Sequence, residues 1–258
     1  MTFDPDRFAA TLLELRAART PIGARADRPS TDAEGTAAQF ALARRLGADP
    51  PAGFKIGATG RRMQQYLGMS EPVAGFMETR NLHRSGASLE LAAFTRPAVE
   101  CELAVRLARD LPTGPCTAAQ AEAAVGDLMA GIEIVENRYE TDLAAVGTPT
   151  VIADQMFHAA AVIGAPVANW RGLDMPSLTG RFLIDATERD RGVATELLGH
   201  PMNCVAWLAG SQVARAFGGL RAGQVIMLGS VTPPIWLNSS AKVEVVFDGM
   251  PVVALTLW

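Results

Sequence analysis

Lysine is scarce in this sequence of 258 residues. Lysine and arginine together number 23, but only Lys55 and Lys242 are lysine. Coding bias toward arginine explains the imbalance. Arginine, however, holds its proton too tightly to exchange it near neutral pH, whereas a buried lysine can. Lys242 precedes an alternating run and is expected on an exposed strand. Lys55 lies between Phe54 and Ile56, where desolvation would lower its pKa, so it is the candidate for proton transfer.

Other absences exclude whole classes of protein. Three cysteines without a CxxC spacing form no disulfide framework, which predicts a reducing, cytoplasmic environment. A net charge of −4 without a basic stripe argues against a nucleic-acid partner. The first seven residues are acidic and lack an apolar segment, so no signal peptide is expected, and no apolar run is long enough to span a membrane.

Helical patterns occupy the first fifty residues. Phe8 to Ala18 carries its large apolar side chains on one side, and Thr31 to Glu34 is a capping box that opens a helix ending near Leu46. Two helices alone bury too little apolar surface for independent folding. We therefore predict a helical subdomain over residues 1–50, joined to one catalytic unit over residues 51–258.

The rest of the chain mixes strands and helices without a regular alternation. Helices are predicted from Thr117 to about Met129 and from Asn203 to Phe217, and a hairpin over 242–258. This order excludes Rossmann and TIM-barrel folds and predicts an α+β protein with a mixed or largely antiparallel sheet. Single strands are predicted over residues 53–57, 99–107, 131–135 and 224–228.

Three glutamates stand in apolar strand surroundings. Glu100 and Glu102 project from the same face of one predicted strand, with Cα atoms about 7 Å apart. Glu133 lies between Ile132 and Ile134 in another. Carboxylates that close repel one another and lose hydration, and a cation between them offsets both effects. Three oxygen donors without a nearby histidine or cysteine favour Mg²⁺ or Mn²⁺.

Each acid also has a simpler explanation when taken alone. A Glu-x-Glu pair on a strand is most often a solvated face, and Glu133 also fits a buried ion pair with Arg138. The combination of Lys55 with Glu100, Glu102 and Glu133, each in an apolar strand, favours a metal-assisted site.

Short motifs around these residues extend along nearly the whole chain. They are FKIGAT (54–59), MQQYLG (63–68), EP (71–72), RPAVECELA (96–104), RDLP (109–112), GIEIVENR (131–138), AD (153–154), VAWLA (205–209) and LRAG (220–223). Each is weak by itself. In this order the series resembles the 2-oxopent-4-enoate (2-hydroxypentadienoate) hydratases and the related 4-oxalocrotonate decarboxylases of the fumarylacetoacetate hydrolase superfamily.

The resemblance implies a fold, a cofactor and a reaction. The fold would be a mixed β-roll or sandwich with flanking helices, in a homo-oligomer. Glu100, Glu102 and Glu133 would hold Mg²⁺ or Mn²⁺. The enzyme would be a lyase, a hydratase that adds water to a short 2-hydroxy-dienoic or 2-keto acid through a metal-bound enolate. Lys55 falls on the family's catalytic lysine and would move protons.

Several positions depart from the family pattern. Val73 stands where the hydratases place an acid that is thought to help deliver water. Gln155 and Phe157 stand where the family shows asparagine and serine, and Gly60 stands where serine is common. The metal and enolate residues are therefore retained, whereas the polar groups that handle water are fewer.

Three residues are predicted to bind the substrate. Arg62 follows a glycine turn and would pair with the substrate carboxylate, although adjacent arginines in a loop are most often solvated. Gln155 takes the place of the family's asparagine. Ser230 ends a strand in a loop that resembles one near the family's substrate.

Three functions remain open from the sequence. The first is a hydratase for a more apolar dienoate, with Glu136, Asp154 or His158 orienting water, although His158 also fits a packed histidine. The second is a decarboxylase, C–C hydrolase or keto–enol isomerase, which need not add water to an alkene. The third is a non-catalytic protein that binds a 2-keto acid or a metal. The retained Lys55 and acids argue against the third.

Overall fold

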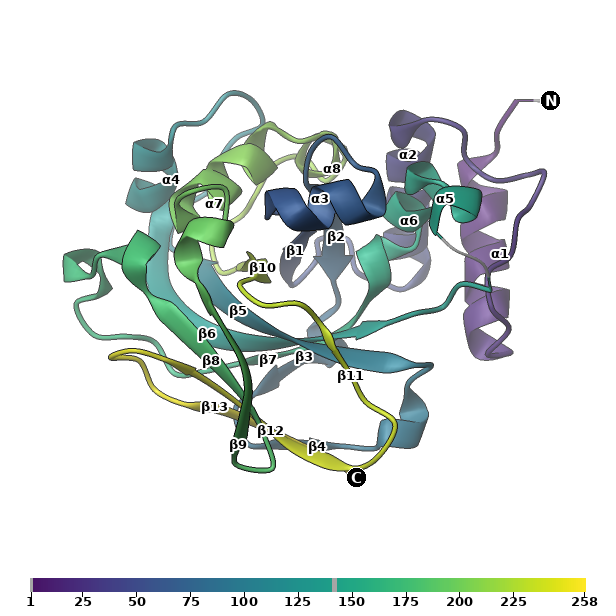
Figure 1. Cartoon of the computed structure of the whole chain (residues 1–258). Coiled ribbons are helices and arrows are strands. Elements are labelled where there is room, and N and C mark those ends of the chain that lie inside the picture. Colours follow the sequence, from purple (N-terminus) through teal and green to yellow (C-terminus); the bar gives the residue numbers. More distant parts are fainter. Residues whose placement is uncertain (1, 141–142) are drawn as a thin grey trace.

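A strongly curled sheet forms the centre of the molecule, between a layer of helices and a second sheet (Figure 1). The structure is a computed structural model that describes residues 2–140 and 143–258. The strands of the curled sheet are β1 (Gly53–Gly57), β2 (Val73–Met77), β3 (Leu82–Arg84), β5 (Pro97–Leu107), β6 (Val125–Glu136), β7 (His158–Ile163), β10 (Val225–Ser230) and β11 (Ile235–Trp236). Their order is β2-β1-β10-β5-β6-β7-β3, with β11 paired to β5. Parallel and antiparallel neighbours are mixed, as predicted.

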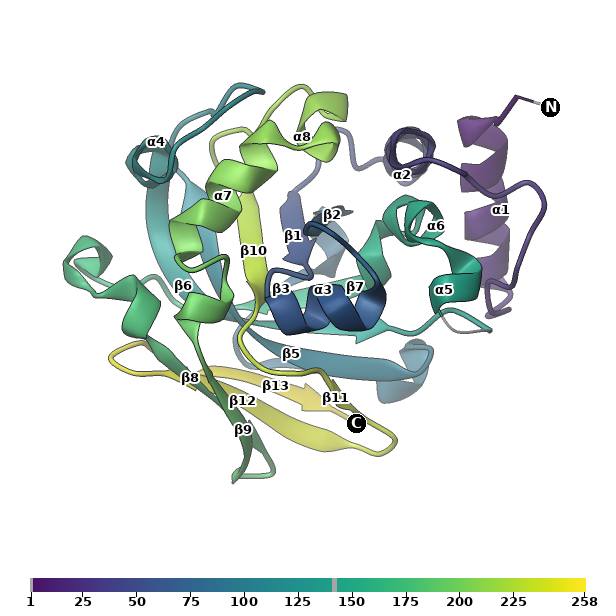
Figure 2. The same cartoon turned by 45° about the horizontal axis from the view of Figure 1, so that its top comes forward.

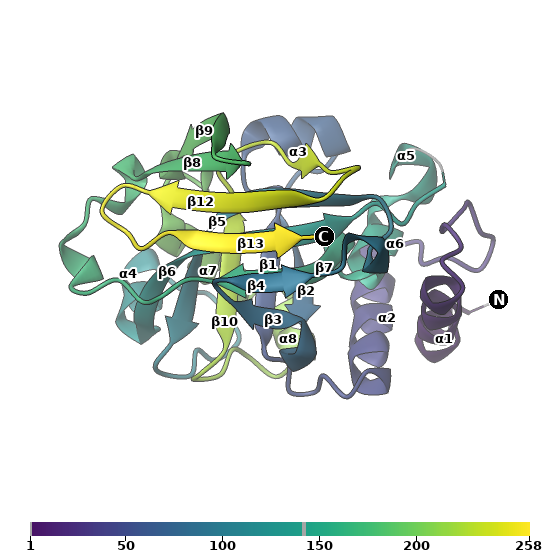
Figure 3. The same cartoon turned by 90° about the horizontal axis from the view of Figure 1, so that it is seen from below.

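The second sheet packs against the outer face of the curled sheet. Figure 3 shows it from below, crossing the strands of the first sheet. Contacts of β12 and β13 with β6 join the two sheets. The strands of the second sheet are β4 (Ala87–Leu89), β8 (Thr179–Ile184), β9 (Thr187–Val193), β12 (Ala241–Phe247) and β13 (Val253–Leu257), in the order β4-β13-β12-β8-β9.

Helices cover the curled sheet on the side of the molecule away from the second sheet (Figure 2), and Phe217, at the end of the last of them, packs on the outer face of β1 and β2. The helices are α1 (Pro5–Ala17), α2 (Asp32–Arg45), α3 (Arg61–Leu67), α4 (Ala118–Ala124), α5 (Leu143–Val146), α6 (Thr148–Ala153), α7 (Pro201–Gly210) and α8 (Gln212–Ala216). The N-terminal pair α1 and α2 lies at one edge, where α2 also packs on α6. Within the described residues, none of these helices has the length and apolar character needed to cross a bilayer.

Side-chain caps set the start of the N-terminal helices. The Asp4 carboxylate accepts a hydrogen bond from the Arg7 amide, so α1 begins at Pro5, earlier than predicted. The Thr31 hydroxyl caps α2 as predicted, but the Glu34 carboxylate bonds to Ser30, so the reciprocal half of the capping box is absent between Thr31 and Glu34.

Two predicted helices are wrong in extent. The helix expected over 117–129 ends at Ala124, because residues from Val125 onward pair with β5 along its whole length. The helix expected over 203–217 is divided at Ser211, whose hydroxyl accepts a hydrogen bond from Ala214 and caps a new helix. The strand expected to be half-buried over 99–107 is largely buried on both faces, because the second sheet covers its outer face and the curl of its own sheet encloses its inner face.

The register of the curled sheet separates its inner face from its outer face. Residues paired across neighbouring strands point to the same side. Lys55 pairs with Gly75 and with Met227, and Glu100 pairs with Glu133. The outer face of β1 and β2 packs its aromatic side chains on Phe217. A separate apolar cluster fills part of the inner face: Met77, Ala104, Met129, Ala161, Ile163, Val225 and Met227. The remaining part of the inner face holds Lys55 and the three acids.

Candidate metal centre

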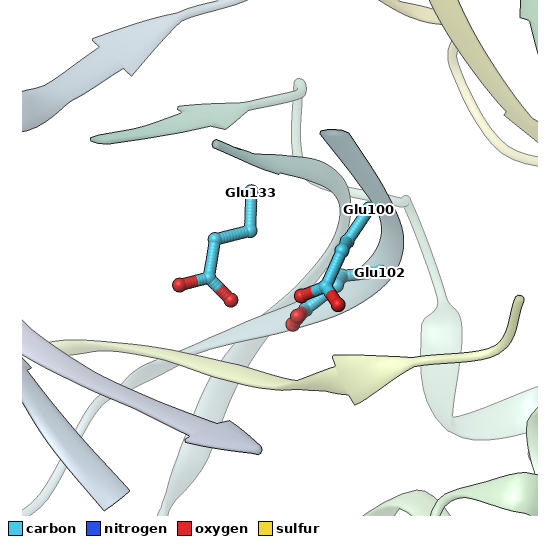
Figure 4. A group of neighbouring side chains, drawn as sticks. All are labelled: Glu100, Glu102 and Glu133. Atoms are coloured by element: carbon cyan, nitrogen blue, oxygen red, sulfur yellow. The ribbon is translucent and has the colours of Figure 1, made fainter. Parts of the chain in front are cut away.

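Glu100, Glu102 and Glu133 direct their carboxylates into one space on the inner face (Figure 4). Glu100 lies directly opposite Glu133 across β5 and β6, and Glu102 is two residues further along β5. One oxygen from each of the three acids lies within 4.8 Å of the others. Glu102 and Glu133 are fully buried, so the predicted solvated Glu-x-Glu face is excluded.

The protein's own groups satisfy these acids only in part. Lys55 Nζ lies 3.3 Å from Glu133 Oε2, and His158 Nδ1 lies 2.9 Å from Glu133 Oε1. The Gly229 amide donates to Glu102 Oε2 at 2.9 Å. In the part of the chain that the structure describes, Glu102 Oε1 and Glu133 Oε2 are buried without a hydrogen bond. Three ionised acids beside one lysine leave an excess of negative charge, so the residues present fit a divalent cation.

The pKa values within this group show the same excess of negative charge. Burial raises the pKa of Glu100 to about 7, helped by the charge of Glu133. Burial, with the charges of Glu133 and Glu100, raises the pKa of Glu102 well above its ordinary value. Burial opposes ionisation of Glu133 too, but Lys55 and the hydrogen bond from His158 outweigh it and lower that pKa. Glu133 is therefore the acid that stays ionised most readily.

Lys55 differs from its sequence-based prediction in one respect. Its side chain is 2% exposed on the inner face, as an apolar strand context predicts. Burial favours its neutral form, but Glu133, followed by Glu100 and Glu102, outweighs burial and raises the pKa of Lys55. The expectation that the pKa of Lys55 is lowered is therefore wrong for the protein without a cation, where Lys55 is the group that balances the three carboxylates. A cation among the acids would remove much of their effect on the lysine.

His158 reaches the centre from an irregular turn. Gln155, Met156 and Phe157 have φ values of +61°, +51° and +65°. The left-handed region costs a residue with a side chain about 1–2 kcal/mol. A register shift between Ile134 and Val135 follows the turn and pairs His158 with Val135, on the inner face. Sequence analysis could not find the contact between His158 and Glu133, because it depends on this bulge.

The other residues considered for water or substrate have different partners. Gln155 is buried, accepts from Arg16 and donates to the Phe76 carbonyl. The Ser230 hydroxyl bonds the backbone of Cys101, between Glu100 and Glu102. Arg62 is exposed on α3 and makes none of the contacts described for the centre. Of the three predicted substrate residues, the structure thus brings Ser230 beside Glu102, one of the three acids of the candidate centre.

Arg138 does not pair with Glu133, so that alternative from the sequence is wrong. Arg138 pairs with Glu136 and Asp154 at 2.8 Å each. Glu136 also accepts a hydrogen bond from the Thr95 amide. Because Glu136 and Asp154 are held by arginine, His158 is the one of the three candidates for water orientation that touches an acid of the centre.

We expect the stability of the EDTA-treated protein to fall as pH rises from about 6.5 to about 8. The raised pKa values of Glu100 and Glu102 mean that the folded state binds their protons more tightly than the unfolded state, so ionisation favours unfolding. The lowered pKa values of His158 and His83 act in the opposite direction, but only below 6.5. Urea unfolding at several pH values measures the slope, and saturating Mn²⁺ should remove it. A slope unchanged by Mn²⁺ would contradict this assignment of the acids.

The curled sheet and its inner carboxylates define the class of protein. Residues 55–257 match the family model described as fumarylacetoacetate (FAA) hydrolase C-terminal, and the chain belongs to this family. It is 30% identical over 205 residues to a 2-keto-4-pentenoate hydratase of Burkholderia vietnamiensis, which covers 79% of this chain and 77% of that protein. It is 25% identical over 205 residues to a 4-oxalocrotonate decarboxylase of Pseudomonas putida, which covers 78% of this chain and 75% of that protein.

A solved structure has the same fold. The 4-oxalocrotonate decarboxylase of Pseudomonas putida superposes with a TM-score of 0.89 at 22% identity, over 98% of this chain and 97% of that chain. That protein was solved with magnesium and adipate, and also with calcium and acetate. The α+β fold prediction and the resemblance to this family are confirmed.

Proposed function

We propose that the protein is a divalent-metal-dependent hydratase that adds water to a short 2-hydroxy-dienoate. The observation that carries this proposal is the placement of Lys55 3.3 Å from Glu133, within a group of three acids in which Glu102 Oε1 and Glu133 Oε2 are buried without a hydrogen bond to any described residue. The relatives named 2-keto-4-pentenoate hydratase support the reaction and the substrate class.

The site residues have separate roles in this reaction. Glu100, Glu102 and Glu133 would hold a divalent ion, Mg²⁺ or Mn²⁺ by their chemistry, and this ion would supply Lewis acidity to stabilise the enolate of the substrate. Lys55 would carry the proton that leaves the C2 hydroxyl to C5 of the dienoate, so that the C2 carbonyl and the new C5–H bond form together. The resulting C3–C4 double bond is conjugated to the C2 carbonyl, so water adds at C4 and a proton at C3.

The surroundings of Lys55 favour an apolar substrate tail. Val73 pairs with Gly57 and therefore shares the inner face with Lys55. Met156 also lies against Gly57, where its side chain is within 2.9 Å of the position that a Cβ would take. A dienoate with a hydrogen or an alkyl group at its far end fits these neighbours better than a second carboxylate does. We keep Arg62, Gln155 and Ser230 as proposed substrate-binding residues.

A decarboxylase for a 2-keto acid is the second candidate. Val73 provides no acid for water delivery, and decarboxylation needs none. The similarity to a 4-oxalocrotonate decarboxylase supports the same alternative. Both candidates use the metal and Lys55. The decarboxylase would release C1 of the substrate as CO₂, whereas the hydratase would add water to the double bond.

Product analysis separates these functions. Purified protein with Mg²⁺ or Mn²⁺ is expected to remove the ultraviolet absorbance of freshly generated 2-hydroxypentadienoate and to form 4-hydroxy-2-oxopentanoate, identified by mass spectrometry. Release of CO₂ from 4-oxalocrotonate, without hydration of the dienoate, would instead show the decarboxylase. Absence of either product while Mn²⁺ still binds would overturn both and leave a binding protein.

We also propose a cytoplasmic homo-oligomer. The buried thiols of Cys101 and Cys204 are free, as a reducing compartment allows. Trp236 and Trp258 are 53% and 60% exposed, which is unusual for so large an apolar side chain and suits a contact between subunits. Light scattering after size-exclusion chromatography tests the subunit number, and a monomer would contradict this part of the proposal.

A further inference from the structure

A buried ionic cluster holds the start of the turn formed by the left-handed residues 155–157. Asp154 Oδ1 accepts hydrogen bonds from Arg16 Nε at 3.0 Å and Nη2 at 2.6 Å. Asp154 Oδ2 accepts from Arg138 Nε at 2.8 Å and from the Tyr139 hydroxyl at 3.2 Å. Both oxygens of the Asp154 carboxylate therefore accept hydrogen bonds from side chains that lie far apart in the sequence. We call Arg16, Asp154 and Arg138 the arginine clamp.

The same arginines also bind the rest of the turn. Arg138 Nη1 donates to the His158 carbonyl at 3.1 Å, and Arg138 Nη2 donates to the Asp154 carbonyl at 3.0 Å. Arg16 Nη1 donates to Gln155 Oε1 at 2.8 Å. One guanidinium thus spans both ends of the turn, and the other fixes its first residue. These contacts explain how three consecutive left-handed residues are maintained.

The turn is pressed against β1 and β2. At Gly75 a Cβ would lie 2.4 Å from the Gln155 carbonyl oxygen, and at Gly57 it would lie 2.9 Å from the Met156 side chain. The sheet accepts the turn at this distance because both positions are glycine. The turn then delivers His158 to Glu133, with Nδ1 2.9 Å from Oε1, while Oε2 of the same carboxylate lies toward Lys55.

We propose that the arginine clamp and His158 are positioning residues for Glu133. The clamp fixes the turn, the turn fixes the imidazole, and the imidazole holds Glu133 Oε1, so that Oε2 is presented to the cation. This inference rests on the proposed metal-dependent function. It also gives α1 a role, because Arg16 belongs to that helix and supports the centre from outside the sheet.

The first test measures the Mn²⁺ affinity of the full chain after EDTA treatment. Electron paramagnetic resonance detects the free Mn²⁺ in the titration. Loss of a hydrogen bond to a metal ligand typically weakens metal binding about 10- to 100-fold. We expect His158→Ala to fall in this range. His158→Asn keeps a donor near the place of Nδ1 and should recover part of the affinity.

The second test asks whether Arg16 acts through His158. Arg16→Met is expected to weaken Mn²⁺ binding about tenfold, and Arg16→Lys should lie between the variant and the wild type, because an ammonium lacks the fork that binds Asp154 and Gln155 together. In the double variant, Arg16→Met should add little to His158→Ala, since coupled residues are not additive. Arg44→Met is the matched control: it breaks an exposed ion pair with Asp6 between α1 and α2 and should leave Mn²⁺ affinity unchanged.

The outcomes distinguish this inference from the proposed function. Wild-type protein that fails to bind Mn²⁺ would overturn the metal-dependent function. The positioning role alone would be overturned by a different result: the wild-type protein binds Mn²⁺, and every folded variant binds it with the same affinity. These variants include the conservative Arg16→Lys and His158→Asn as well as the larger replacements. A lower melting temperature with unchanged Mn²⁺ affinity would likewise show that the clamp serves stability only.

Discussion

Replacement of Lys55 by methionine is expected to lower kcat by about 10²- to 10⁴-fold, the usual contribution of a positioned proton-transfer group. Methionine is close to lysine in length and apolar, so the buried position is filled without the ammonium. Divalent-ion affinity should stay the same or increase, because the positive charge 3.3 Å from Glu133 is removed. The rate of absorbance loss from 2-hydroxypentadienoate measures the first effect, and Mn²⁺ titration measures the second.

The sequence supplies a matched control for this experiment. Lys242, the other lysine of the chain, is exposed on β12, as predicted. Lys242→Met should leave both turnover and Mn²⁺ affinity unchanged. A Lys55→Met variant that folds, binds Mn²⁺ and retains full turnover would exclude Lys55 as the proton carrier.

Part of the grouping of the three acids could be predicted from the sequence, because it depends on strand periodicity. Two residues of separation place Glu100 and Glu102 on one face of β5, whatever the rest of the fold does. Glu133 required more, since only the pairing of β5 with β6 sets it opposite Glu100. Glu133 joins the other two acids in the sequence-based prediction through its apolar surroundings and the family resemblance, and neither contains that pairing.

The contacts around the turn could not be predicted, because they join distant segments. Arg16 is 138 residues from Asp154, and its place in an amphipathic helix gives no sign of a buried partner. The left-handed conformation of Gln155 is equally hidden, since glutamine carries no preference for it. For this reason the sequence makes Asp154 one of three candidates for orienting water, whereas the structure pairs it with two arginines.

Tertiary pairing also decided the boundary between α4 and β6. The expected helix extends to about Met129. Val125, Gly126 and Asp127, however, are weak helix formers, and β5 offers this segment a partner along its full length. Pairing there buries Val125 and Leu128 completely. Burial and weak helix propensity therefore both favour a strand from Val125 onward.

Glu102→Gln is expected to weaken Mg²⁺ and Mn²⁺ binding by at least about 100-fold, as removal of a charged ligand from a hard-cation site implies. The same change should stabilise the EDTA-treated protein above about pH 7, because burial and the neighbouring acids already raise the pKa of Glu102 and oppose its ionisation. The amide oxygen of glutamine can still accept the hydrogen bond from Gly229. Calorimetric titration with Mn²⁺ and urea unfolding in EDTA measure the two effects.

The two responses together identify a metal ligand. Neutralising a carboxylate that serves the fold removes an interaction and lowers stability, whereas neutralising Glu102 removes a repulsion that only a cation relieves. Wild-type protein at 100 times its Kd for Mn²⁺ should gain about 2.7 kcal/mol against unfolding, and Glu102→Gln should gain almost none. Glu244→Gln, on half-buried β12 of the second sheet, should bind Mn²⁺ normally. If Glu102→Gln bound Mn²⁺ as tightly as wild type, the charge excess on the inner face would need another explanation than a cation between the three acids.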